Sequence, residues 1–70
     1  MSVRVTINGS PRDLPEDATV ATVVTELTGV HNGRGVAVAL AGEVVPRAAW
    51  STTVLPDGAD IEVVRAVQGG

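Results

Sequence analysis

The chain has 70 residues, which predicts one small domain with no room for a second. It contains no cysteine and one histidine, so it offers no disulfide, no thiolate metal site and no zinc site built by histidine alone. Its net charge of −3 argues against a nucleic-acid binder, and no apolar run is long enough to span a membrane.

Hydrophobic residues make up 44% of the sequence, yet Trp50 is its only aromatic residue. Valine is the commonest of them, and its branched side chain favours a pleated sheet. The chain lacks Cys, Lys and Tyr, which leaves mainly carboxylates and hydroxyls for acid, base or nucleophile chemistry. We therefore predict a sheet-rich domain that is not itself an enzyme. Residues 1–8 lack the basic and apolar regions of a signal peptide, so we expect a cytoplasmic protein.

The first fifteen residues predict a β-hairpin. Apolar and polar side chains alternate over residues 1–7, which is the period of a half-buried strand. Asn8 and Gly9 follow, and both residue types tolerate the positive φ of a tight hairpin turn. The returning strand, residues 10–14, contains Pro11, which has no N–H to donate. We therefore expect this strand at an edge of the sheet.

Residues 19–28 predict a helix. Four apolar side chains recur at i, i+3, i+4 and i+7, namely Val20, Val23, Val24 and Leu27. Thr19 or Asp17 can cap the first turn, and Gly29 can end the helix. Valine is a middling helix former, so we expect the helix to depend on packing of this stripe. Leu27, the largest of the four side chains, is expected to contribute most to stability.

A second hairpin follows the helix. Residues 36–40 alternate larger and smaller apolar side chains, which predicts a strand. Ala41 and Gly42 then turn the chain into a fourth strand, residues 43–45, which Pro46 ends.

The last part of the chain predicts a crossover and one more strand. Residues 46–55 show no regular pattern, and we expect an irregular crossover with Trp50 and Leu55 anchored beneath it. Residues 56–58 read Pro-Asp-Gly, which is a turn by residue chemistry. Residues 61–67 form the last predicted strand.

This order of elements predicts an α+β domain over residues 1–67, followed by a Gly-Gly tail at residues 68–70. One helix packs across one face of a mixed sheet of about five strands. The opposite face must then meet water or a partner. The small apolar side chains that alternation places on this open face are Val64, Ala66, Ala37 and Ala39. We expect them to form a docking patch, because exposed apolar patches often mark interaction sites, although self-association of the chain would cover them equally well.

Three further features each have an ordinary and a functional explanation. His31 lies in a glycine-rich loop without a second histidine, so we interpret it as a solvated loop residue. Asp57, Asp60 and Glu62 form either a solvated turn or an acidic surface that speeds association with a basic partner. The absence of lysine reflects a bias toward arginine, or it leaves an activated C-terminus fewer amines to attack.

The sequence finishes with Gly69 and Gly70, which is either a frayed terminus or a reactive one. Glycine has no Cβ, so a Gly-Gly end can enter a narrow cleft. It delivers an α-carboxylate that is ionised at pH 7. A carboxylate is unreactive as an electrophile until one oxygen becomes a leaving group, for example by adenylation with ATP. We therefore take Gly70 as the candidate site of modification and Gly69 as the residue that gives it access.

Several segments carry a resemblance that spans the whole chain. The most specific are residues 43–47 and 61–70, supported by residues 5–9 and 36–40. These segments resemble the ubiquitin-like β-grasp sulfur carriers, most closely the ThiS-type carriers of thiamine biosynthesis. Ala41 departs from the Asn that this family usually has before glycine, and Ala59 departs as an insertion. Both departures lie in predicted turns, so they leave the chemistry unaffected.

The resemblance implies a protein substrate rather than a catalyst, with no bound cofactor. In such carriers the terminal glycine, here Gly70, is adenylated by an adenylyltransferase related to the ubiquitin-activating enzymes, which consumes ATP. A sulfurtransferase system then replaces the adenylate and leaves a thiocarboxylate. The thiazole synthase takes that sulfur to build the thiazole ring of thiamine.

Other readings of the sequence stay open. The small subunit of molybdopterin synthase has the same expected fold and a Gly-Gly end, but it is generally longer and richer in aromatic residues. Sulfur carriers for cysteine synthesis or tRNA thiolation are a second alternative. A non-activated β-grasp binding module is a third, for which a Gly-Gly end and a charge of −3 are both unexpected.

Overall fold

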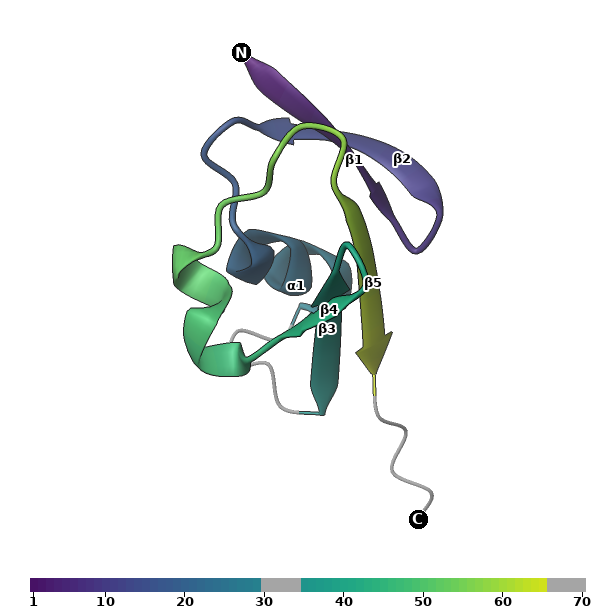
Figure 1. Ribbon diagram of the computed structural model, residues 1–70, viewed down its shortest axis with the longest axis vertical. Coiled ribbons are helices and arrows are strands. Elements are labelled where there is room, and N and C mark those ends of the chain that lie inside the picture. Colours follow the sequence, from purple (N-terminus) through teal and green to yellow (C-terminus); the bar gives the residue numbers. More distant parts are fainter. Residues whose placement is uncertain (30–34, 66–70) are drawn as a thin grey trace.

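The computed structural model describes residues 1–29 and 35–65. Within these residues one helix packs against one face of a five-stranded sheet (Figure 1). The strands are β1 (Ser2–Ile7), β2 (Ser10–Pro15), β3 (Val36–Leu40), β4 (Glu43–Val45) and β5 (Asp60–Arg65). Their order in the sheet is β2-β1-β5-β3-β4, with β1 and β5 parallel and the other pairs antiparallel. The predicted α+β architecture is confirmed.

The first hairpin has the predicted turn and edge position. Asn8 and Gly9 both have positive φ, 52° and 84°, which matches the right-handed twist of the two strands that they join. β2 lies at the edge of the sheet, as Pro11 required. Leu14 is the one residue of β2 that is buried, so this strand contributes little to the core.

The helix α1 spans Val20–Thr28 and is capped at both ends as predicted. The Thr19 hydroxyl oxygen accepts a hydrogen bond from the Thr22 N–H at 3.3 Å, and the Thr19 N–H donates to the Thr22 hydroxyl at 3.2 Å. This is a capping box in which threonine takes the usual place of glutamate. At the other end Gly29 has a φ of 72°, and its N–H donates to the Thr25 carbonyl at 2.8 Å.

One prediction about the helix was wrong. Val20, Val23 and Val24 are at most 1% exposed, whereas Leu27 is 40% exposed. Seven residues make nearly two full turns, so Leu27 has the angular position of Val20. Its exposure therefore comes from its place along the axis, where the last turn extends past the buried cluster. The spacing of apolar residues predicts a direction around a helix but not how far the partner surface reaches.

The core lies between α1, the sheet and the crossover. Its buried residues are Val5, Ile7, Leu14, Ala18, Val20, Val23, Val24, Val38, Trp50, Leu55, Ala59, Ile61 and Val63. Trp50 and Leu55 are 5% and 1% exposed, which confirms them as the anchors of the crossover. The Trp50 indole Nε1–H donates to the Val45 carbonyl at 2.8 Å, so the ring is buried without leaving its polar atom unpaired.

The crossover itself is more regular than expected. Residues 47–52 form a 3₁₀ helix, η1 (Arg47–Thr52), where the sequence predicted irregular chain. Only Trp50 is buried among its six residues, so no apolar period marks this short helix in the sequence. The Thr53 hydroxyl donates to the Ala49 carbonyl at 2.7 Å and pairs a carbonyl at the end of the helix.

Some predictions fall outside the described residues. These are His31, Ala66, the end of the last predicted strand and the tail at residues 68–70. No helix within residues 1–29 and 35–65 is long and apolar enough to cross a membrane.

Candidate functional site: the open face of the sheet

The face of the sheet opposite α1 carries the predicted apolar side chains. In β5, Ile61 and Val63 are buried toward the helix, while Val64 is 61% exposed on the other side. Ala37 is also exposed, and it lies directly opposite Val64 in the antiparallel pairing of β3 with β5. The predicted alternation of inner and outer residues is therefore confirmed here.

A hollow of about 200 Å³ lies on this open face. Its lining residues are Ala37, Val38, Ala39, Val44, Glu62 and Val64. The hollow is shallow because Ala37 and Ala39 of β3 each have only a methyl group as side chain. Val64 of β5 and Val44 of β4 extend further from the sheet on either side. We call this the open-face patch. It comprises three of the four predicted docking residues, and the fourth, Ala66, is not among the described residues.

Val44 belongs to this patch and was missed in the sequence. It is 77% exposed and faces Ala39 across the β3–β4 pair. A two-residue turn at Ala41 and Gly42 fixes this register, because it makes Leu40 and Glu43 the first opposing pair. The signal was therefore present in the turn length.

The acidic residues before the tail do not act as one surface. The Asp57 carboxylate accepts a hydrogen bond from the Arg4 N–H at 2.8 Å, and the Asp60 carboxylate accepts from the Thr6 hydroxyl at 2.9 Å. Both bonds join the start of β5, or the turn before it, to β1. Only Glu62 lines the hollow of the open-face patch. Two of the three carboxylates therefore hydrogen-bond to β1, and the third lies on the open face.

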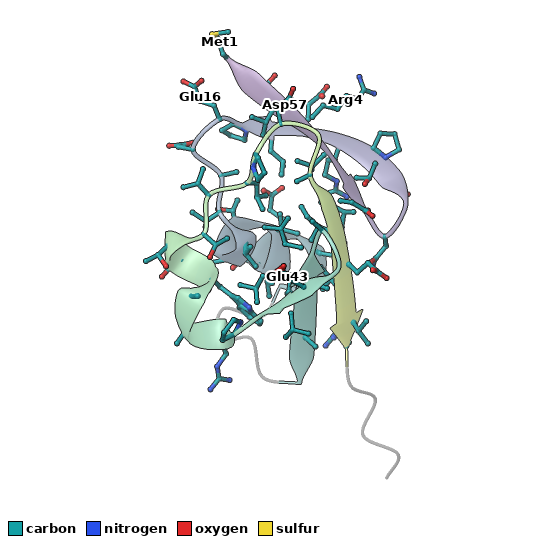
Figure 2. All side chains as sticks on the ribbon, viewed as in Figure 1. Met1, Arg4, Glu16, Glu43 and Asp57 are labelled. Carbon is teal, nitrogen blue, oxygen red and sulfur yellow. The ribbon has the colours of Figure 1, made fainter. Side chains whose placement is uncertain are left out.

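A second hollow, about 280 Å³, lies at the other end of the molecule. It is lined by Arg4, Val5, Thr6, Pro11, Asp57 and Gly58. Figure 2 shows Arg4 and Asp57 together at the end of the molecule where the chain begins, away from the carboxyl end of β5. This hollow is separate from the open-face patch. No group of three or more metal-ligating side chains occurs in the described part of the chain.

Comparisons with known proteins agree with this geometry. The model of the ThiS family matches residues 5–70. The chain belongs to the ThiS family. It is 31% identical to a crystal structure of the thiamine biosynthesis protein ThiS from Geobacter metallireducens, with a TM-score of 0.76 over 97% of this chain and 100% of that one. No curated protein matches the chain.

An NMR solution structure of a thiamine biosynthesis protein from the same organism gives the same identity and TM-score, and the match covers 88% of that chain. These likenesses confirm the resemblance to the ThiS-type carriers and the ubiquitin-like β-grasp fold.

The two departures from the ThiS pattern differ in their structural effect. Ala41 has a φ of 52° in the second hairpin turn, a conformation that Asn adopts more readily than Ala. Ala59 is 7% exposed, and its carbonyl accepts a hydrogen bond from the Thr6 N–H at 2.9 Å. Ala59 ends the predicted turn, where its N–H donates to the Pro56 carbonyl at 3.1 Å, and it is also part of the core and begins the pairing of β1 with β5.

Proposed function

We propose that this chain is a sulfur carrier of thiamine biosynthesis that holds sulfur as a thiocarboxylate at Gly70. The observation that carries the proposal is the family match over residues 5–70, which includes both terminal glycines. The absence of cysteine supports it, because no thiol is available to carry sulfur as a persulfide. The terminal carboxylate is then the remaining place for simple acyl chemistry.

The proposed chemistry has two steps. A carboxylate oxygen of Gly70 first attacks the α-phosphorus of ATP, which forms an acyl-adenylate and releases pyrophosphate. Hydrosulfide delivered by a sulfurtransferase system then attacks the acyl carbon, displaces AMP and leaves the thiocarboxylate. Gly69 gives the terminus access because a residue without a Cβ leaves the chain narrow. Both steps take place in partner enzymes, which makes this chain a substrate.

The open-face patch is the proposed docking surface for the adenylyltransferase and for the thiazole synthase. Val44 and Val64 are more than half exposed, and burying them against a partner would release ordered water from apolar surface. Both flank a hollow into which a partner side chain can insert. Because β5 lines the patch and then leads toward Gly70, docking there brings the terminus into the partner.

Mass spectrometry of the intact chain tests this function. The chain is incubated with ATP, the activating enzyme of a thiamine pathway and a sulfur donor. One oxygen should be exchanged for sulfur, and fragmentation should map the change to Gly70. Sulfur found at another residue, or activation only by the corresponding enzyme of molybdopterin synthesis, would contradict the proposal. A reaction lacking ATP serves as the control.

A further inference from the structure

The side chain of Asn8 contacts β5 near its carboxyl end. Its Oδ1 accepts a hydrogen bond from the Val63 N–H at 2.9 Å, and its Nδ2 donates to the Val63 carbonyl at 3.2 Å. One amide group thus pairs with both backbone groups of a residue 55 positions away in the sequence. The sequence pattern predicted only a hairpin turn at Asn8.

The pairing has a clear geometric meaning. β1 runs parallel to β5, and the Thr6 and Asn8 N–H groups donate to the carbonyls of Ala59 and Ile61 at 2.9 and 2.8 Å. In a regular parallel ladder the next bond would run from the Val63 N–H to the Asn8 backbone carbonyl. The chain turns away at Asn8, where φ is 52°, so this backbone partner is lost. The Asn8 side chain takes its place.

The same side chain also replaces a second missing partner. In a continued strand the Val63 carbonyl would accept from the N–H of residue 10, but Ser10 already belongs to β2. The Nδ2 of Asn8 supplies that donor. Val63 is 7% exposed, so its backbone groups are shielded from water and need protein partners. Beyond this point, within the described residues, only β3 pairs with β5.

We propose that Asn8 is a positioning residue for the reaction at Gly70. Its amide extends the β1–β5 pairing past the end of β1 and holds β5 at Val63, two residues before its last residue, Arg65. The proposal rests on the proposed function, because only an activated terminus gives that contact a chemical consequence. A fixed end of β5 limits the directions in which the carboxylate can meet the bound ATP, and such alignment raises the rate of reaction within the docked complex.

The turn and the amide can be separated by substitution. Asn8→Gly keeps a residue that accepts positive φ and removes the amide. Asn8→Asp keeps the side-chain acceptor but sets a second oxygen against the Val63 carbonyl, so the donor is lost. Ala41→Gly is the matched control, because Ala41 has the same φ of 52° in the other hairpin turn and no side-chain hydrogen bond to lose.

Amide hydrogen exchange in the free protein measures the contact. The Val63 N–H should exchange about tenfold faster in Asn8→Gly than in the parent chain, relative to core amides such as that of Val38, because its acceptor is gone. The Ala41→Gly control should leave this ratio unchanged. Equal exchange of Val63 in the parent chain and in Asn8→Gly would overturn the proposal.

Steady-state adenylation measures the role. We expect kcat for pyrophosphate release to fall about tenfold in both Asn8 variants, with KM for the carrier unchanged because the open-face patch is intact. An unchanged kcat, or an equal fall in the Ala41→Gly control, would overturn the positioning role while the parent chain still reacts. A parent chain that is not adenylated at all would instead refute the proposed function, and the positioning role with it.

Discussion

Truncation of two apolar residues in α1 tests how the helix packs, and the structure reverses the ranking expected from their size. Val24 is 1% exposed, so Val24→Ala removes two methyl groups from a closed core. Losing the burial of these two methyl groups lowers the free energy of unfolding by about 1.6 kcal/mol, and the cavity left behind lowers it by about 1 kcal/mol more. Alanine is the better helix former by about 0.5 kcal/mol, which leaves a net loss of roughly 2 kcal/mol.

Leu27→Ala removes a larger side chain but should cost less. Leu27 is 40% exposed, so water can enter the space that a truncation opens and no closed cavity forms. We expect a loss of about 1 kcal/mol or less, part of which the helix propensity of alanine offsets. The order of the two variants, rather than either value, is the sharp prediction.

Urea denaturation followed by fluorescence measures both losses. Trp50 is the sole aromatic residue and is 5% exposed, so its emission reports unfolding of the core without interference. A domain of this size has an unfolding free energy of about 4–10 kcal/mol. In a thermal melt, the loss of roughly 2 kcal/mol in Val24→Ala should lower the midpoint by roughly 10 °C. The slope of the unfolding free energy with urea should stay constant. A greater loss for Leu27→Ala than for Val24→Ala would refute this account of the packing.

Three other predictions follow from the site and the turns. Val64→Asp should weaken binding to the adenylyltransferase at least tenfold in a titration, because a charge replaces apolar contact area. The urea midpoint should stay the same. Normal binding of this variant would show that the open-face patch is not the docking surface. Deleting Gly70 should abolish pyrophosphate release, because the terminal carboxylate then lies one residue earlier in the chain. The urea midpoint should stay unchanged, because the deletion removes none of the core residues. Ala41→Asn should stabilise the fold by about 0.5–1 kcal/mol in the same denaturation assay, because Asn tolerates the positive φ better; no gain would show that the turn is not strained.

Local patterns were enough to predict most of the fold. Alternation identified the strands, Asn8 with Gly9 identified the first turn, and Pro11 assigned β2 to an edge. Capping chemistry placed both ends of α1, with Thr19 before its first residue. These features depend on neighbours in the sequence, which is why they could be read without knowing the tertiary structure.

Apart from the 3₁₀ helix η1, the features that were missed depend on the register of paired strands or on how far a packing surface reaches. The exposure of Leu27 depends on where the surface beneath α1 stops, and the burial of Ala59 depends on where β5 begins to pair with β1. Val44 joins the open-face patch through its register with β3. The bond from Asn8 to Val63 joins two residues that no local pattern relates. Sequence patterns therefore predicted the elements better than the contacts between them.

β5 combines three roles that its alternation keeps apart. Its inner residues, Ile61 and Val63, anchor the core, while Glu62 and Val64 line the outer hollow. Its backbone is held on one side by β3 and on the other by β1 and Asn8. Substitutions on the inner face should therefore change stability, and those on the outer face should change docking. Loss of the Asn8 contact should change the exchange of the Val63 N–H and the kcat of adenylation, with docking unchanged.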